Sequence, residues 1–351
     1  MDRITRLLST STRKSRIIEI GASYTPTAPK AAGWNTHVVD HADQATLRAK
    51  YAPAAVDVSA IEPVDTVWRD GPLHEAVPAA LVGQFDTLIV SHVIEHMPDF
   101  IGFLASAERL LGPDGMIAAA LPDRRYCFDC FRPPTMTGDI LQAHASGRTR
   151  HDLRTAWDHT AYAAQAGGVL GWGPWKVEPP EFIDDFAAAD RLRSRFNADV
   201  AAPYVDFHAW QFTPAGFELV MLELGEMGLI DWSIATSHGP ENFEFFVFLR
   251  RGVARVSDPV ALQKRRMGLI RQLMIETYQQ ISLIVPDAEL GHVMPAPPPP
   301  ESIADPVVLT EIKMLLEGMD RRLRDLEATA AMTRSALAPL RALRRLFRRR
   351  R

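Results

Sequence analysis

Unbroken apolar runs alternate with turns and helical spacing along the first part of the chain. Ile17, Ile18 and Ile20 form an apolar, β-branched run of the kind found in strands that are buried on both faces of a parallel sheet. Similar short runs recur, each followed by a turn or a helical stretch. The pattern predicts strands at residues 16–20, 38–40, 54–58, 85–92 and 116–121.

The clearest predicted helix lies between the last two of these strands. Apolar residues recur at helical spacing from Phe100 to Leu111, Pro98 suits a first helical turn, and Gly112 ends the periodicity. A turn at residues 112–115 then leads into the next apolar strand. This βαβ unit predicts an α/β fold with a doubly wound, Rossmann-like, mostly parallel sheet.

A second group of elements is expected to close the sheet. Thr213 and Pro214 are an N-cap followed by proline at the first helical position, which predicts a helix to Met227 that stops at Gly228. Strands are predicted at residues 229–235 and 243–249, with a turn around Gly239-Pro240. These two strands are expected to form an antiparallel hairpin.

The turn after the first strand carries candidate binding chemistry. Gly21 lets the backbone turn sharply and lets a ligand approach the main chain. Asp40 follows nineteen residues later, close to the spacing at which a carboxylate binds ribose hydroxyls in dinucleotide-binding folds. The glycine-rich phosphate motif is incomplete, because Ser23 and Pro26 replace two of its glycines. The alternatives are a nucleoside ligand without pyrophosphate, such as S-adenosylmethionine, and a plain strand and turn. Pro26 and Pro29 also limit any helix here to a short one.

Composition and charge narrow the class of protein. The chain has 351 residues, 47% of them hydrophobic and 23% charged, which is ordinary for a globular protein with a sizeable core. No apolar run reaches the length of a membrane span and no signal-peptide core precedes the first strand, so we expect a cytoplasmic protein. The last eleven residues hold seven arginines and no acid, so a total net charge of −4 leaves −11 on the other 340 residues. This acidic body argues against nucleic acid as a partner.

The two cysteines exclude a disulfide framework. Cys127 and Cys130 form a lone Cys-x-x-Cys, which is either half of a zinc site completed by His144 and His151 or a pair of reduced thiols beside aromatic residues. The gap between the two histidines is wider than in finger-type zinc sites. We therefore predict no metal site.

Several motifs in a fixed order carry a family resemblance. They are Glu19-Ile-Gly21, Asp40, Phe85-Asp86, Ser91-His-Val-Ile-Glu-His96 and Leu110-Leu-Gly-Pro-Asp-Gly115. In this order and spacing the chain resembles class I S-adenosylmethionine-dependent methyltransferases of the type 11 branch. The resemblance covers residues 16–123 and returns more loosely at residues 212–250. It implies S-adenosylmethionine as the cofactor and a sheet closed by the antiparallel hairpin.

The resemblance also implies the residues of a cofactor site. Glu19, Gly21 and Ala22 would line the methionine end with Ser23 nearby, Asp40 with its neighbour His41 would bind the ribose, Asp57 would face the adenine, and Ser91 would lie beside the methyl group. For Asp57, a simply solvated acid is the alternative.

A methyl acceptor with a hydroxyl group needs a base, and histidine is the usual choice near neutral pH. His92 is the first candidate and His96 the second, with capping of the following helix as the alternative role of His96.

Residues 124–211 form an insertion where the family has a short link. We predict that it is a substrate lid, with a structural elaboration as the alternative. Its candidate ligand-binding residues are Arg124, Arg125, Tyr126, His144, Arg148, His151, Asp158, His159, Trp172, Trp175, Asp206, His208 and Trp210.

Beyond residue 251 the chain changes character. The predicted organisation is a methyltransferase domain at 1–251, a helical extension at 252–290 with a helix from Pro259 to Ile284, a Pro-rich linker at 291–305, and a coiled-coil-like helix with an Arg-rich tail at 306–351. The coiled-coil seam at 306–337 suits self-association or a partner helix, against packing on its own domain. The tail suits the inner face of an anionic membrane or is merely solvated.

These observations predict an enzyme that transfers a methyl group from S-adenosylmethionine to an oxygen of a small polar or saccharide acceptor. A saccharide or a lipid-linked glycan intermediate handled at the inner membrane surface is the favoured acceptor, and a small polar metabolite would suit the same residues. The alternative is a catalytically inactive binding or scaffold protein with the same fold in a membrane-surface assembly.

Overall fold

The computed structural model describes residues 2–197, 204–286 and 289. The chain divides into two compact units, Met1–Asp287 and Ala288–Arg351. The predicted linker, coiled-coil helix and Arg-rich tail lie outside the described residues. No helix in the described part of the chain is both long enough and apolar enough to cross a bilayer.

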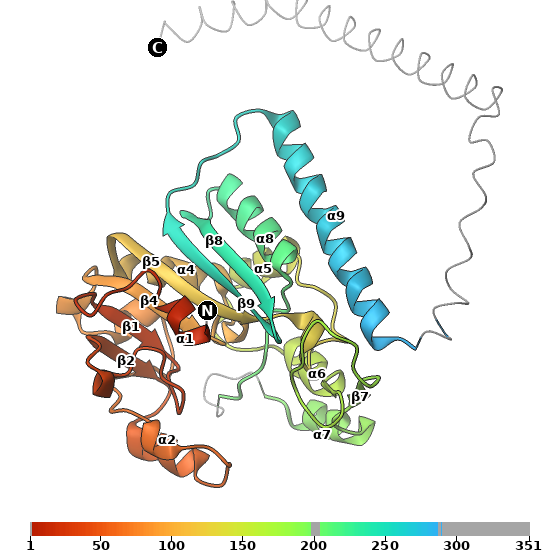
Figure 1. The fold of residues 1–351 in the computed structure, drawn as a ribbon, viewed down its shortest axis with the longest axis horizontal. Coiled ribbons are helices and arrows are strands. Elements are labelled where there is room, and N and C mark those ends of the chain that lie inside the picture. The colour runs from red at the N-terminus through yellow and green to blue at the C-terminus, as the bar shows by residue number, and fades with distance from the viewer. Residues whose placement is uncertain (1, 198–203, 287–288, 290–351) are drawn as a thin grey trace, which may run out of the picture. The chain divides into compact units, whose positions relative to one another are not determined.

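A seven-stranded sheet forms the centre of the first unit (Figure 1). Its strand order is β3-β2-β1-β4-β5-β9-β8, with β1 to β5 parallel and β9 antiparallel to both of its neighbours. The strands are β1 (Ile17–Ile20), β2 (Thr36–Asp40), β3 (Thr66–Val67), β4 (Phe85–Ser91), β5 (Leu111–Pro122), β8 (Trp232–Glu241) and β9 (Glu244–Arg251). The predicted doubly wound sheet with an antiparallel hairpin is confirmed.

Alternate residues of the central strands belong to two separate apolar cores. Ile18 and Leu88 belong to the larger core, whereas Ile17 and Ile89 belong to a smaller core that includes Leu7. Successive side chains of a strand point to opposite faces, so a strand covered on both sides reads as a continuous apolar run. This explains why the sequence pattern located β1 and β4.

Helices and short 3₁₀ turns cover the sheet. Before the insertion they are α1 (Arg3–Leu7), η1 (Lys30–Ala32), α2 (Gln44–Tyr51), η2 (Val58–Ala60), α3 (Leu73–Ala76), η3 (Ala79–Leu81), η4 (Ile94–His96) and α4 (Phe100–Leu110). After it come α8 (Pro214–Glu226) and α9 (Pro259–Ile284). The predicted range of α9 and the Thr213 cap of α8 are confirmed, and the link from β1 to β2 holds only the three-residue η1, as its prolines predict.

Two local predictions are wrong. Residues 54–58 form no strand; the third strand is Thr66–Val67, where β-branched Thr66 pairs with Val39 of β2. The hairpin turns at Asn242-Phe243 rather than at Gly239-Pro240, because Asn242 adopts a positive φ of 52° and asparagine tolerates that conformation. The expected turn at residues 112–115 falls within the range of β5, but the pairing with β4 jumps there from Phe85–Leu111 to Thr87–Met116 and leaves these four residues without a partner in β4.

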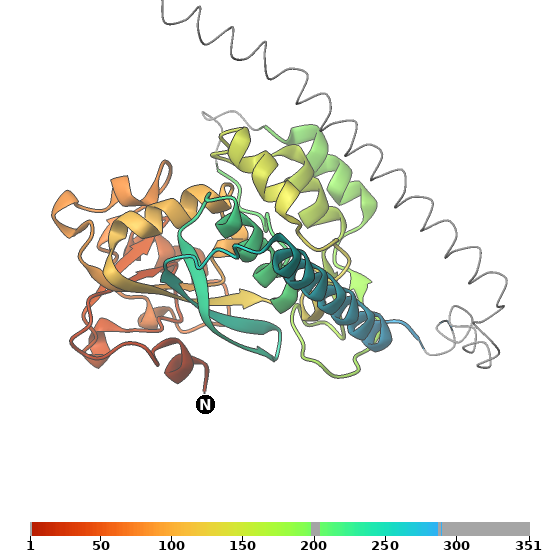
Figure 2. The same ribbon diagram turned by 90° about the horizontal axis from the view of Figure 1, so that it is seen from above.

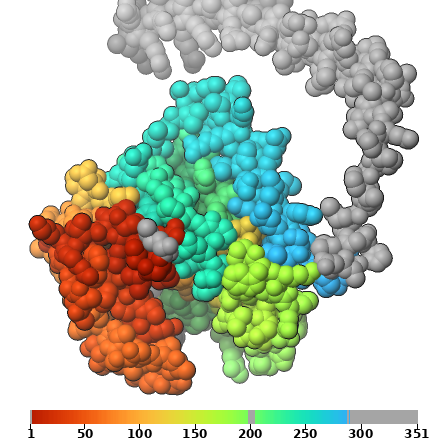
Figure 3. Space-filling model, viewed as in Figure 1, coloured from red at the N-terminus to blue at the C-terminus, as the bar shows by residue number. Residues whose placement is uncertain are grey.

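The insertion leaves and rejoins the sheet at one place. Asp123 and Phe212 form a parallel bridge, so both ends of the insertion lie beside β5. Its elements are η5 (Arg124–Tyr126), α5 (Thr137–Ala145), α6 (Leu153–Ala161), β6 (Ala164–Gln165), β7 (Glu181–Phe182) and α7 (Phe186–Arg195). Figure 2 shows α6 and α7 side by side, away from the N-terminal strands. In the space-filling view, the insertion and the N-terminal strands stand on either side of a recess (Figure 3).

Helix α9 packs on the sheet domain. Its Leu273 is buried, Glu276 accepts a hydrogen bond from the backbone N–H of Ala215 on α8 (3.3 Å), and the Gln280 amide donates to the carbonyl of Cys130 (2.6 Å). The predicted helical extension therefore joins α8 to the insertion.

Candidate functional site

The carboxyl ends of the parallel strands gather the candidate chemistry at one edge of the sheet. Gly21 follows β1, Asp40 ends β2, and His92 follows β4. Glu244 begins β9, and because β9 runs antiparallel, its first residue lies at the same edge. Ligands of open α/β sheets bind outside this edge.

Gly21 turns the chain with a positive φ of 67°. A Cβ built on it would lie 3.2 Å from Cγ2 of Val93, so any larger residue would be both strained and crowded. Ser23 also adopts a positive φ, of 45°, and its buried hydroxyl has no hydrogen-bond partner among the described residues. Ala22 between them is buried. The loop therefore offers an unsatisfied polar group beside a close backbone approach.

Glu19 holds this loop. Its two carboxylate oxygens accept hydrogen bonds from the backbone N–H groups of Thr27 (2.6 Å) and Ala28 (3.0 Å). Burial raises the pKa of Glu19, and these backbone donors partly offset that effect. The structure thus gives Glu19 a structural task, and its predicted contact with the methionine end stays a prediction.

Asp40 presents a buried carboxylate at the tip of β2. Its Oδ1 lies 2.8 Å from the backbone nitrogen and 2.7 Å from Nδ1 of His41, whereas its Oδ2 has only a long 3.4 Å contact with the backbone nitrogen of Ser23. Oδ2 thus retains capacity to accept hydrogen bonds from ribose hydroxyls. Together with Gly21 and the Ser23 hydroxyl, Asp40 fits a nucleoside that carries no phosphate.

Asp57 does not lie at a strand end. It is exposed and caps η2, where its Oδ1 accepts hydrogen bonds from the backbone nitrogen and hydroxyl of Ser59. The acid that follows β3 closely is Asp70, which is also exposed. Sequence reasoning missed Asp70 because it placed the third strand too early.

At the end of β4, the ring of His92 contacts Glu244, which also pairs with Arg3. Its backbone adopts a positive φ of 53°, and its Nε2 lies 2.9 Å from Oε2 of Glu244. Arg3 of α1 donates to the same carboxylate (2.8 Å) and to the hydroxyl of Ser91. Burial alone would raise the pKa of Glu244, but the hydrogen bond with His92 and the charge of Arg3 lower it below its ordinary value. An ionised Glu244 therefore fixes the ring of His92.

A cluster of histidines surrounds Glu95 in η4. The carboxylate of Glu95 is 1% exposed, and its Oε1 lies 3.6 Å from His92 Nδ1, 3.9 Å from His96 Nε2 and 4.0 Å from His208 Nε2. The backbone carbonyl of Glu95 accepts hydrogen bonds from the N–H groups of Ala209 (2.6 Å) and Trp210 (3.1 Å). These backbone bonds bring His208, at the far end of the insertion, to Glu95.

Carboxylates hold the outer side of this cluster. His208 Nδ1 lies 2.5 Å from Asp129, and His96 Nδ1 lies 3.1 Å from Asp206. Burial would raise the pKa of Asp129, but the charge and hydrogen bond of His208 lower it far below its ordinary value. Burial would likewise lower the pKa of His96, whereas Asp206 and Glu95 raise it. Asp99, not His96, caps α4 by accepting a hydrogen bond from Gly102, so the capping role considered for His96 is wrong.

The other predicted residues of the insertion divide into structural and surface groups. Arg124 and Arg125 are buried and bonded within the insertion's first turn, while Tyr126 and Trp172 pack with Cys130. Burial raises the pKa of Cys130 to about 12 and raises that of Cys127 as well, so both cysteines stay as neutral thiols. Among the described residues, neither cysteine pairs with His144 or His151. Trp175 is 52% exposed.

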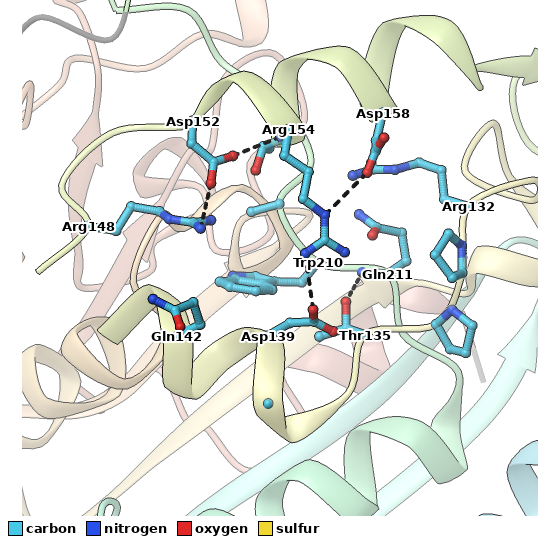
Figure 4. A pocket seen from close by; sticks show the side chains of 15 residues that line it. Arg132, Thr135, Asp139, Gln142, Arg148, Asp152, Arg154, Asp158, Trp210 and Gln211 are labelled. Carbon is cyan, nitrogen blue, oxygen red and sulfur yellow. Dashed lines mark hydrogen bonds and ion pairs between the residues drawn. The ribbon is translucent and has the colours of Figure 1, made fainter. Parts of the chain in front are cut away.

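A small polar pocket of about 200 Å³ lies between α5 and α6 (Figure 4). Trp210 and Gln142 line it, together with arginines and aspartates that form the ion pairs Arg148–Asp152, Arg154–Asp139 and Arg154–Asp158. Arg132 links this pocket to the histidine cluster, because its guanidinium donates to Asp129 (2.8 Å). Such a volume suits a small polar group rather than a drug-sized ligand.

Four residues of the site were not predicted from the sequence. Arg3 and Glu244 lie 241 positions apart in the chain, and no local pattern connects them. Glu95 lies inside the motif at residues 91–96, between His92 and His96. This spacing does not show that its carboxylate is buried. Asp129, between the two cysteines, is likewise defined only by its contact with His208.

The chain is similar to known proteins chiefly over its N-terminal half. A family model described as "Methyltransferase domain" matches residues 1–174, and no curated protein matches the chain. The branch of the family named from the sequence motifs stays a prediction.

Three solved structures are similar to this chain at low sequence identity. A protein described as a Zn-dependent alcohol dehydrogenase from Rhodobacter sphaeroides is 15% identical (72% of this chain, 89% of that chain, TM-score 0.38). The CcbJ methyltransferase from Streptomyces caelestis is 10% identical (72% and 97%, TM-score 0.38). The 1,6-didemethyltoxoflavin-N1-methyltransferase from Burkholderia thailandensis, with bound 1,6-didemethyltoxoflavin and S-adenosylhomocysteine, is also 10% identical (71% and 76%, TM-score 0.35). At these values the three structures carry no argument about activity.

Proposed function

This chain belongs, through residues 1–174, to the class I S-adenosylmethionine-dependent methyltransferases, and we propose that it methylates a hydroxyl oxygen of a small polar or saccharide acceptor. The observation that carries the proposal is the pairing of His92 with Glu244 at the carboxyl end of β4. A base positioned there lies at the edge where ligands of such sheets bind.

The proposed cofactor site uses the loop after β1 and the tip of β2. Gly21 allows close approach of the cofactor, the Ser23 hydroxyl gains a partner, and Asp40 Oδ2 accepts hydrogen bonds from the ribose hydroxyls. His41 and Ser91 border this site, and Asp70 is the acid nearest the end of β3. S-adenosylmethionine, when bound, supplies an electrophilic methyl group and leaves as S-adenosylhomocysteine.

His92 is the proposed general base. With the Nε2 proton shared with Glu244, Nδ1 carries a lone pair that accepts the acceptor's hydroxyl proton. Removal of this proton by His92 would leave the acceptor oxygen as the nucleophile toward the methyl group that bound S-adenosylmethionine would supply. The nearby carboxylates of Glu244 and Glu95 stabilise the resulting imidazolium.

The insertion supports a polar acceptor. Its pocket between α5 and α6 combines the indole of Trp210 with the amide of Gln142 and paired charges (Figure 4). The amide and the charged groups offer hydrogen bonds to ligand hydroxyls, while Trp210, which is 2% exposed, closes one wall of the pocket. This composition favours a saccharide or another hydroxylated small molecule over an apolar acceptor.

Two measurements test the proposal. Calorimetric titration with S-adenosylmethionine should show binding, and its absence up to millimolar concentration would favour the inactive scaffold protein. Incubation with methyl-labelled cofactor and fractions of a cell extract should place the label on oxygen in a glycan or polar metabolite, as read by mass spectrometry.

His92→Gln is expected to lower the transfer rate by about 10²- to 10⁴-fold with little change in cofactor affinity, because the base acts only in the chemical step. His238→Gln, which changes an exposed histidine on β8, is the matched control and should leave the rate unchanged. Equal rates for the two variants would remove His92 from the mechanism.

A further inference from the structure

The buried carboxylate of Glu95 lies 3.6 to 4.0 Å from three histidine nitrogens but has no hydrogen-bond donor among the described residues. It is 1% exposed, and neither oxygen has a hydrogen-bond partner among the described residues. A buried charge without donors or a cation is strongly unfavourable. Something positively charged must therefore stand next to Glu95, or the carboxylate must take up a proton.

Two imidazole nitrogens face this carboxylate. His96 Nε2 lies 3.9 Å and His208 Nε2 lies 4.0 Å from Glu95 Oε1, and the three ligand atoms lie within 4.8 Å of one another. His96 comes from η4 and His208 from the far end of the insertion. The tertiary fold, rather than chain spacing, thus assembles the group.

Carboxylates lie beside the outer nitrogens of both rings. Asp129 pairs with Nδ1 of His208 at 2.5 Å, whereas Asp206 lies 3.1 Å from Nδ1 of His96, which has no hydrogen-bond partner among the described residues. A carboxylate on one ring nitrogen keeps the proton there and leaves a lone pair on the other nitrogen, which is the usual arrangement around metal-bound histidine. With both rings neutral, two lone pairs and the carboxylate meet with no hydrogen-bond donor among the described residues. Such a group is complementary to a cation.

We propose that Glu95, His96 and His208 bind a divalent transition-metal ion of the zinc class. Imidazole and carboxylate are its typical ligands, at about 2.0 to 2.2 Å from the ion, and tetrahedral ligand atoms then stand about 3.4 Å apart. The observed separations from Glu95 need to close by only about half an ångström. Three protein ligands leave a fourth position open, as in catalytic rather than structural sites.

The open position lies next to the proposed base. Nδ1 of His92 is 3.6 Å from Glu95 Oε1. An acceptor hydroxyl bound to the ion would lose its proton more readily, because the metal lowers the pKa of a bound hydroxyl or water. Binding of the ion itself does not depend on the methyl-transfer proposal.

The test uses the full chain after removal of metal with a chelator, in the absence of S-adenosylmethionine. Titration with ZnCl₂ by calorimetry should give one ion per chain at micromolar affinity or tighter. Titration with CoCl₂ should produce the intense visible absorption of a four- or five-coordinate ion. Absence of stoichiometric binding would overturn the proposal and leave a proton as the cation in the cluster.

Variants locate the ion. Glu95→Gln keeps the side-chain shape and removes the buried charge, so the protein should fold, as checked by circular dichroism, yet bind Zn²⁺ at least 10-fold more weakly. Asp129→Asn should weaken binding by about 10- to 100-fold through His208, an effect that a merely structural role would not produce. The double variant Cys127→Ser/Cys130→Ser is the control and should bind normally. Unchanged affinity in Glu95→Gln would place the ion elsewhere and overturn the assignment.

Discussion

The acidic side chains at the strand ends differ in whether their carboxylate oxygens already have hydrogen-bond partners. Glu19 uses both oxygens on the loop after β1, whereas Asp40 keeps one oxygen with only a long contact. The two acids are equally buried, so burial alone would not distinguish them. Their hydrogen-bond partners make Asp40 the better candidate for the ribose.

Asp40→Ala is expected to weaken S-adenosylmethionine binding by about 1 to 3 kcal/mol, because it removes a charged acceptor and leaves the ribose hydroxyls unpaired. Calorimetric titration checks the affinity, and thermal unfolding checks that the fold survives. Asp114→Ala is a matched control, since Asp114 is exposed near the amino end of β5, at the opposite edge of the sheet. Equal affinities in the two variants would show that Asp40 does not contact the cofactor.

His159 makes folding stability depend on pH. Its Nδ1 accepts a hydrogen bond from the backbone N–H of His208 (3.1 Å), and burial lowers the pKa of His159 to about 3. Between pH 6.5 and about 3 the unfolded chain binds a proton that the folded chain does not. The free energy of unfolding therefore falls as pH falls through this window, by up to about 1.4 kcal/mol per pH unit.

His159→Asn keeps an acceptor near Nδ1 but cannot titrate. We expect its free energy of unfolding, measured by urea denaturation at pH 7, 6, 5 and 4, to decline less steeply than that of the unmodified chain. The absolute stability at pH 7 changes through lost packing as well, so the slope is the readout. Parallel pH curves would contradict the assignment.

Helix α9 packs against two other elements of the same unit and does not form a separate module. It contacts α8 through Leu273 and Glu276 and the insertion through Gln280. Arg266 adds an ion pair with Glu223 of α8 (2.6 Å). Because α9 touches both α8 and the turn that opens the insertion, it fixes one side of the insertion relative to the sheet.

Leu273→Ala is expected to destabilise the protein by about 2 to 4 kcal/mol, since it removes a buried side chain and leaves a cavity against α8. Met274→Ala, on the same helix, changes a residue that is 68% exposed and should cost less than about 0.5 kcal/mol. Chemical denaturation followed by circular dichroism compares the two. Similar losses would mean that α9 is not packed through Leu273.

At the scale of the whole molecule, the compact unit that ends at Asp287 contains the sheet, the insertion and α9. The rest of the chain carries the Pro-rich segment, the predicted coiled coil and seven terminal arginines. The boundaries drawn from the sequence and the predicted self-association of residues 306–337 stay predictions. We therefore expect methyl transfer to depend on the first unit and membrane contact to depend on the arginines at the end of the chain.

A chain shortened to residues 1–287 is expected to fold and to bind S-adenosylmethionine like the full chain. The full chain should sediment with vesicles that contain an anionic phospholipid and not with neutral vesicles, because each basic residue near the headgroups contributes about 1 kcal/mol. The shortened chain should sediment with neither. If the full chain ignores anionic vesicles, the tail is simply solvated.

Most strands of the sheet follow from local sequence patterns, as do the positions of Gly21 and Asp40 at strand ends. Apolar runs at β1 and β4, the periodicity of α4, and the Thr213 cap are local signals that arise from burial and backbone geometry. Gly21 and Asp40 were found for the same reason, because each follows directly from a strand end. Short β3 escaped this reasoning, since two residues carry too little pattern to distinguish a strand from a loop.

The contacts around the proposed base depend on the tertiary structure. His92 gains its partner Glu244 from β9, and Glu95 gains His208 from the end of the insertion. Contacts between residues so distant along the chain depend on how the sheet closes and how the insertion returns to η4 through backbone bonds. Local periodicity records which face of an element is buried, but it does not record which distant element lies against that face.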